Sequence, residues 1–263
     1  MNTLNDILNQ EIIDNPEQWF ESVCKILFYR TVFHIKDQRY KITEAELYLK
    51  TDDLNDHPDV FTHGSHEQRK SGLFYFHKKG RGGIDITFGK ESSRYGGILL
   101  RGMESLDDKS YIDGPLKLSQ RIVEDLGGEN VKDVVRTLDI DIFNDEDLWL
   151  EETSGNDQVN VIYKAPRVGL ALSKDVESHL PYFAKLYRYL ADPLKTKKGK
   201  ELLSVALKNQ GHDPLLLLEG LGKNTLNNYM ALFQAGVESD LQDSYKNNEL
   251  FHIGVFGELS RNN

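Results

Sequence analysis

The chain has 263 residues, of which 32 are basic and 42 are acidic, so its formal net charge is -10. Its length and its apolar fraction of 39% are sufficient for one large domain with a buried core, with or without an extension. No segment approaches the roughly 20 consecutive apolar residues of a membrane-spanning helix, and the acidic first residues carry no secretory signal. The single cysteine, Cys24, excludes an internal disulfide and a cysteine-based zinc site. We therefore expect a cytoplasmic protein.

The first predicted element is a helix over residues 16–28, where apolar side chains recur at helical spacing after Asn15 or Asp14 as the N-cap. Beyond it, β-forming residues predict several strands, separated by a long polar loop over residues 51–68 and a glycine-rich loop over residues 78–83. Another helix is expected after a turn at Asp113, because Pro115 suits a first helical turn. The predicted strands cover residues 30–34, 40–49, 73–76, 84–88 and 97–101.

The predicted secondary structure changes from mainly β to mainly helical beyond Pro193. Residues 140–150 and 159–172 still have mixed β character, whereas residues 195–200 form a short basic linker. Two amphipathic helices follow, each predicted to end near a glycine, and alternating apolar residues then indicate a final strand. We predict an α+β domain over residues 1–194 and a mostly helical extension of unknown role over residues 195–263. The two helices cover residues 201–209 and 225–235, ending near Gly211 and Gly236, and the final strand contains Phe251, Ile253 and Val255.

Two glutamates lie within the strand predicted at residues 40–49. Period two places Glu44, Glu46 and Tyr48 on one face together with apolar neighbours. Burial and a second carboxylate nearby both disfavour the ionised form of a carboxyl group, which prepares a general base for activating water near neutral pH. The alternative is an edge strand whose glutamates face solvent.

A basic segment stands out against the acidic chain. Residues 69–101 contain eight basic and two acidic side chains, which gives this segment a net charge of +6. This segment is either an ordinary solvated face or a binding surface for an anionic ligand. Within it, the glycine-rich loop has Lys78, Lys79 and Arg81, so its backbone could approach a phosphate. The histidines and aspartates of residues 51–68 match no compact metal-ligand spacing, and we predict no metal site.

Several segments, taken in order, resemble the alkyladenine (3-methylpurine) DNA glycosylase family. Residues 42–49 (ITEAELYL), with His57 eleven residues after Glu46, are similar to the family's Glu-Thr-Glu-Ala-Tyr core and its histidine at the same distance. The resemblance covers roughly residues 20–190. Its further segments are residues 97–106, 114–120, 145–151 and 167–170, followed by residues 181–187, which are similar to the family's last strand.

The resemblance implies a DNA repair enzyme on a curved, mainly antiparallel sheet flanked by helices. Such an enzyme flips an alkylated or deaminated purine out of duplex DNA and hydrolyses its N-glycosidic bond. Glu46 would activate the water, and Arg101 would lie behind the water site. The expected partner is double-stranded DNA that contains damaged purines. The resemblance implies a monofunctional glycosylase without a metal or organic cofactor and without membrane association, and we expect a monomer.

The family's base-binding pocket can also be transferred position by position. Tyr48 and His57 would line it, with Tyr48 stacking on the flipped base. A third aromatic is expected from residues 73–77; Phe76 is our choice and Tyr75 the alternative. Asp85 occupies the position where the family usually has an asparagine that screens purines by their exocyclic groups.

The loop with Lys78, Lys79 and Arg81 falls where the family has a hairpin that enters the minor groove of DNA. Here the hairpin has no aromatic wedge to fill the gap left by the flipped base, and Asp85 replaces the usual asparagine. These departures leave two alternatives open. One is a non-catalytic nucleic-acid-binding or interaction module on the same fold, and the other is a hydrolase of free nucleosides.

Overall fold

The computed structural model describes residues 3–12, 15–53, 56–77, 82–136, 138, 140–154, 161–172, 176–238 and 249–261. The chain divides into two compact units, the first made of Met1–Ile162 with Tyr189–Ala191 and the second of Tyr163–Arg188 with Asp192–Asn263. This division differs from the one expected at residue 194, because residues 163–188 belong to the second unit. No helix in the described part of the chain is long and apolar enough to cross a membrane.

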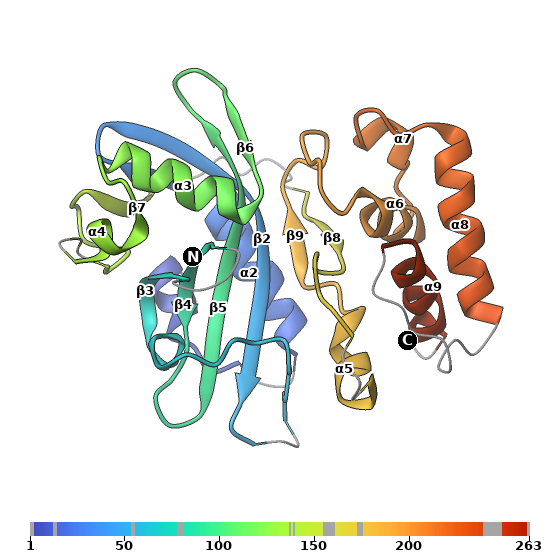
Figure 1. Ribbon diagram of the computed structural model, residues 1–263. Helices are drawn as coiled ribbons and strands as arrows, with labels where there is room; N and C mark the ends of the chain where they lie inside the picture. The colour runs from blue at the N-terminus through green and yellow to red at the C-terminus, as the bar shows by residue number, and fades with distance from the viewer. Residues whose placement is uncertain are drawn as a thin grey trace. The chain divides into compact units, whose positions relative to one another are not determined.

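The first unit begins with helices α1 (Leu4–Leu8) and α2 (Pro16–Tyr29). As predicted, Asn15 caps α2, and its side-chain oxygen accepts a hydrogen bond of 3.1 Å from the backbone N–H of Gln18. The apolar face of α2 packs on the sheet (Figure 1), where the rings of Trp19 and Phe20 lie 4.7 and 6.3 Å from that of Phe88. This contact buries one face of the sheet and leaves the other face for chemistry.

The sheet of the first unit is a strongly curved, antiparallel half-barrel, and with its flanking helices it confirms the α+β class (Figure 1). Its strands follow one another in the order β3-β4-β5-β2-β1-β7, with β6 added to β5 and β9 to β2. The strands are β1 (Thr31–Ile35), β2 (Gln38–Thr51), β3 (Ser71–Phe76), β4 (Ile84–Phe88), β5 (Arg94–Ser105), β6 (Tyr111–Asp113), β7 (Leu148–Glu152) and β9 (Arg188–Leu190).

The long strands β2 and β5 pair with two compensating irregularities. Ile42 pairs with Met103, but Glu44 pairs with Gly102, so Thr43 is an extra residue in β2. Ala45 then pairs with Leu100, which makes Arg101 an extra residue in β5 and restores the original register. Such β-bulges re-aim side chains locally. The sequence predicted that the side chains of residues 40–48 alternate regularly between the two faces of the sheet. The bulge interrupts this alternation between Ile42 and Glu44, and it is regular from Ala45 onwards.

Shorter helices complete the first unit. The polar loop before β3 contains a 3-10 helix, η1 (His66–Arg69), capped by Ser65. Helix α3 (Pro115–Asp125) starts at Pro115 as predicted, and α4 (Val131–Val135) follows it. Residues 78–81 of the glycine-rich loop, and with them Lys78, Lys79 and Arg81, lie outside the described residues.

The second unit is mostly helical, as expected for the C-terminal extension, but two predicted strands are wrong. Residues 181–183 belong to a helix and residues 184–187 to no strand, and residues 251–255 lie within a helix. Gly236 does not end its helix, which continues to Glu238. The elements are β8 (Tyr163–Ala165), α5 (Val176–Phe183), α6 (Lys200–Asn209), α7 (Pro214–Leu217), α8 (Lys223–Glu238) and α9 (Glu249–Ser260).

Glycines explain how α8 and α9 pack. A Cβ atom on Gly236 would lie 1.9 Å from the carbonyl oxygen of Gly254, and one on Gly257 would lie 2.0 Å from that of Phe233. The two helix backbones therefore touch at glycines, which serve as contact points rather than helix stops. Ile253 and Val255 are both fully buried on α9, and a short helix that is apolar on all sides cannot be distinguished from a strand by its hydrophobic period.

Candidate active site

One row of paired residues crosses four strands of the sheet. Glu46 on β2 pairs with Leu99 on β5, Leu99 pairs with Asp85 on β4, and Asp85 pairs with Tyr75 on β3. Directly paired residues project from the same face of a sheet. Glu46, Asp85 and Tyr75 therefore share one face, and the backbone positions of Glu46 and Asp85 are about 10 Å apart because one strand separates them.

At the β2 end of this row, four side chains form what we call the carboxylate network: Glu44, Arg101, Glu46 and Tyr48. Arg101 Nε donates a 2.8 Å hydrogen bond to Glu44 Oε1, and Arg101 Nη1 lies 3.3 Å from Glu46 Oε1. The Tyr48 hydroxyl donates a 2.9 Å hydrogen bond to Glu46 Oε2. Glu44, Glu46 and Arg101 are only 1%, 0% and 4% exposed, whereas Tyr48 is half-buried. The predicted catalytic pair, Glu46 and Arg101, is thus brought into direct contact.

The network concentrates charge in a buried place. Burial alone would lower the pKa of Arg101, but the carboxylates of Glu46 and Glu44 outweigh it, so this pKa lies above its ordinary value. The guanidinium therefore stays cationic and is shared between two carboxyl groups. Breaking such a buried pair is costly, because it leaves a desolvated charge without its counter-ion. The geometry holds two carboxyl groups against one guanidinium in a buried place.

Gly102 makes room for the bulge that places Glu44 beside Arg101. A Cβ at Gly102 would lie 2.6 Å from the hydroxyl oxygen of Tyr111 and 2.9 Å from Oγ1 of Thr43. These distances are shorter than real Cβ contacts, so any side chain at this position would push the bulged residues apart. The absence of a side chain at Gly102 is thus a structural requirement of the carboxylate network.

At the β4 end of the row, Asp85 is held by two donors, and we call Gln68, His77 and Asp85 the His77 group. Gln68 Nε2 donates to Asp85 Oδ2, and His77 Nε2 donates to Asp85 Oδ1, both at 2.9 Å. Asp85 and Gln68 are each 1% exposed, whereas the His77 side chain is 17% exposed. Burial lowers the pKa of His77, but its hydrogen bond and ion pair with Asp85 outweigh this, and the net pKa lies above its ordinary value.

Gly97 provides the space in which the His77 group is assembled. A Cβ at Gly97 would lie 2.6 Å from Asp85 Oδ2 and 2.8 Å from Gln68 Nε2. Gly97 pairs with Tyr48 across β2 and β5, so the bare backbone at this point separates the His77 group from the carboxylate network. The two groups therefore occupy neighbouring positions on one sheet face.

Aromatic rings gather beside Asp85. The ring of Tyr75 lies 4.9 Å from that of His77, and the ring of His63, an exposed loop residue, lies 5.5 Å from His77. Phe76, our first choice for the third pocket aromatic, pairs with Ile84 and is 2% exposed in the core on the opposite face. Tyr75, the alternative, is the aromatic that stands in the Glu46 row.

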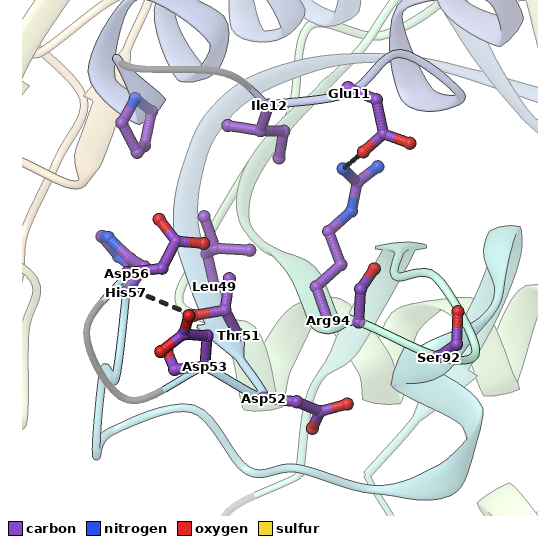
Figure 2. Close-up of a pocket in the computed structure, with 12 residues that line it drawn as sticks. Glu11, Ile12, Leu49, Thr51, Asp52, Asp53, Asp56, His57, Ser92 and Arg94 are labelled. Atoms are coloured by element: carbon purple, nitrogen blue, oxygen red, sulfur yellow. Dashed lines mark hydrogen bonds and ion pairs between the residues drawn. The ribbon is translucent and has the colours of Figure 1, made fainter.

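His57 lines a separate pocket of about 280 Å³, shown in Figure 2. Leu49 and Thr51 of β2, which alternate with Tyr48, form part of its wall, and the lining residues do not include Glu46 or Tyr48. The backbone N–H of His57 donates a 2.8 Å hydrogen bond to Thr51 Oγ1. Its other lining residues are Glu11, Ile12, Pro16, Asp52, Asp53, Asp56, Ser92, Ser93 and Arg94.

The described cations of the basic segment other than Lys70 are paired with carboxylates from elsewhere in the chain. Arg69 donates two hydrogen bonds, of 2.9 and 2.7 Å, to the carboxylate of Asp52. Lys90 donates a hydrogen bond to Glu11. Arg94 forms an ion pair with the same carboxylate, with Nη1 3.7 Å from Oε2 (Figure 2). Together with Arg101 in the carboxylate network, these pairs reduce the free positive charge that the sequence indicated.

The sequence pointed to Glu46, Tyr48, Arg101 and Asp85, but it missed two functional candidates. His77 follows Tyr75 at period two and comes directly after the end of β3, a signal that could have identified it as a residue of the site face. Gln68 lies in η1, far from Asp85 in sequence, and no local pattern marks it. In the described part of the chain, no group of histidine, cysteine and acidic residues is arranged to hold a metal ion.

The chain is similar to a distant relative of viral origin. The chain is 25% identical over 218 residues to the uncharacterized protein L759 of Acanthamoeba polyphaga mimivirus, and the match covers 75% of this chain and 97% of the viral protein. No family model matches the chain. The function must therefore be argued from the site.

Proposed function

We propose that the protein hydrolyses the N-glycosidic bond of alkylated or deaminated purines in DNA. The observation that carries the proposal is the row that joins the carboxylate network to the His77 group on one face of the curved sheet. It combines a buried carboxylate, a fixed cation and aromatic rings within reach of one nucleoside. The resemblance of residues 42–49 to the glycosylase core adds independent support.

In this proposal, Glu46 accepts a proton from the water that attacks the anomeric carbon. Arg101 and Tyr48 fix the carboxylate through Oε1 and Oε2, and a carboxylate can accept more than two hydrogen bonds, so water can also be bound. The negative charge of the network also stabilises the positive charge that develops on the sugar as the base departs. Tyr48 is the half-buried member of the network, so substrate would approach from its side.

The ring of Tyr75 would receive the flipped base. Stacking on aromatic side chains contributes about 1–3 kcal/mol per base, which offsets part of the cost of unstacking. Tyr75 offers its ring in the row beside Asp85, whose carboxylate is held in place by Gln68. A fixed acceptor at this point favours purines that present an N–H donor.

The test is single-turnover excision from duplexes that each contain one hypoxanthine, ethenoadenine or 3-methyladenine, read as alkali-sensitive abasic sites. We expect excision by the wild type and a loss of at least about 100-fold in Glu46→Gln, as for removal of a general base. The matched control is Glu124→Gln on the exposed side of α3, which should retain full activity. Equal excision by the wild type and Glu46→Gln would contradict the assigned role.

Hydrolysis of free nucleosides is the second candidate, and a specific observation favours it. Arg69, Lys90 and Arg94 are engaged by Asp52 and Glu11, so fewer of the described cations of residues 69–101 are left for the phosphates of a duplex. Turnover of free inosine that depends on Glu46 and is not inhibited by duplex DNA would establish this alternative. A cytoplasmic location and a monomeric state stay predictions.

A further inference from the structure

We propose that His77 is the acid that protonates the departing base, with Asp85 as its positioning residue. The inference rests on the proposed glycosidic cleavage and names a second catalytic residue for it. It applies to purines that are uncharged in the nucleotide, such as hypoxanthine, because such a base would have to leave as an anion if it were not protonated.

The step balances with groups that are present at the site. The bond between the sugar carbon and the base nitrogen breaks, and its electron pair goes to the base. The proton on His77 passes to a ring nitrogen of the base, while water adds to the sugar carbon and gives its proton to Glu46. Exchange with solvent then reprotonates His77 and deprotonates Glu46.

The hydrogen bonds of His77 leave it one nitrogen for this task. Nε2 donates to Asp85, and no hydrogen bond to Nδ1 is found within the described ranges of the chain. When the imidazole is protonated, Nδ1–H is therefore the donor available to a ligand. A carboxylate that fixes one ring nitrogen sets the orientation of the other and stabilises the imidazolium, the arrangement used in hydrolase triads.

Asp85 is itself rigidly placed. Its second oxygen accepts from Gln68 Nε2 at 2.9 Å, and the carboxylate is buried against the bare backbone of Gly97. The His77 side chain remains partly exposed, at 17%, so a substrate can reach it. A buried, doubly anchored carboxylate beside an accessible histidine is the geometry that an acid catalyst requires.

In the proposed reaction, His77 acts on the departing base and Glu46 acts on the attacking water. A Cβ at Gly83 would lie 2.9 Å from Leu99 Cδ1 and 3.5 Å from His77 Cδ2, so the His77 ring lies near Leu99. Leu99 is also the residue that separates Asp85 from Glu46 in the row. Two strands, β4 and β5, separate β2 from β3, the strand that precedes His77. The His77 ring therefore approaches the Glu46 side of the sheet by reaching over β4 to Asp85 and towards Leu99.

The charges that face His77 come from several elements. Asp85 on β4 raises the pKa of His77, and the His63 ring in the preceding loop approaches it to 5.5 Å. Tyr75 on β3, two residues before His77, has its pKa raised by burial, with a smaller contribution from Glu67 of η1. The imidazolium therefore has an anionic partner in direct contact, and its nearest titratable ring neighbours are His63 and Tyr75.

The experiment compares two leaving groups in duplex DNA: hypoxanthine, which is neutral, and 7-methylguanine, which is already cationic. A cationic base leaves without an acid, so His77→Gln should lose about 100-fold or more on hypoxanthine and little on 7-methylguanine. His66→Gln, at an exposed position of η1, is the matched control and should change neither rate. Wild-type excision of hypoxanthine should fall as the pH rises through the pKa of His77.

Asp85→Asn tests the positioning role, because loss of the carboxylate should move this fall in rate to lower pH. Unchanged 7-methylguanine excision in His77→Gln also shows that the variant is folded. Equal losses on both bases, or a pH profile that Asp85→Asn does not move, would overturn the inference and leave the proposed function standing. If the wild type excises neither base, both the proposed function and this inference fail.

Discussion

At the scale of single residues, the site depends most on Arg101. It bonds to Glu44 and lies 3.3 Å from Glu46, and all three side chains are buried. We expect Arg101→Met to lower the free energy of unfolding by about 3–5 kcal/mol, because two desolvated carboxylates lose their counter-ion. Urea denaturation followed by circular dichroism measures this change.

The matched control is Arg39→Met, which removes an exposed ion pair with Asp107. Because exposed pairs contribute about 0–1 kcal/mol, this variant should unfold almost like the wild type. Equal destabilisation of the two variants would show that the buried pair has no special energetic role. Glu44→Gln with Arg101→Met should be less damaging than the sum of the single changes, since the two residues share one interaction.

The sequence predicted part of this site, and its limits have a physical cause. Alternation along one strand grouped Glu46 with Tyr48, and the resemblance added Arg101 and Asp85. Alternation does not say which strands become neighbours, so it could not pair Asp85 with Gln68. His57 was expected with Tyr48, but it lines a pocket with Leu49 instead, since the loop returns alongside the end of β2.

At the scale of elements, the α8–α9 contact depends on glycines. Gly257→Ala would place a Cβ 2.0 Å from the carbonyl oxygen of Phe233. Although alanine favours a helix by about 1 kcal/mol over glycine, the clash should dominate and lower the melting temperature by several degrees, as expected for a loss of about 1–3 kcal/mol. Thermal denaturation of the full chain measures the result.

Asn228→Ala, at an exposed position of α8, is the control for helix propensity alone and should leave the melting temperature unchanged or slightly higher. A higher melting temperature for Gly257→Ala would mean that α8 and α9 can move apart without loss of stability.

The elements that sequence analysis placed correctly, such as α2 and α3, carry their own local signals in Asn15 and Pro115. Helix α9 was wrongly predicted to be a strand, because its apolar residues fit the hydrophobic period of a strand as well as that of a helix. Only its contact with α8 distinguishes the two.

At the scale of the whole molecule, the charge balance determines how the protein would meet DNA. The described cations of residues 69–101 other than Lys70 have carboxylate partners, and the sequence places three further cations in the glycine-rich loop. If these four meet phosphates, the logarithm of the binding constant should fall with the logarithm of salt concentration with a slope of about -4. Fluorescence anisotropy with a labelled duplex, measured over a range of salt concentrations, gives the slope.

A slope near twice that value would show that the ion pairs open on binding and that the whole segment contacts DNA. The sequence could not reveal this neutralisation, because the partners Glu11 and Asp52 lie outside the basic segment and approach it only through folding. The fold class, by contrast, depends on local strand and helix signals summed along the chain, and these were sufficient to predict it.

The two bulges in β2 and β5 also limit how the gene can change. Because Thr43 and Arg101 are extra residues that offset one another, deleting either codon alone would slide the pairing beyond it by one position. Every side chain in the slipped part would turn to the other face, and Glu46 and Tyr48 would turn towards the apolar core. Loss of both codons would keep the register and remove the arginine of the carboxylate network. Homologues should therefore vary in length in the loops around these strands and keep the spacing within them.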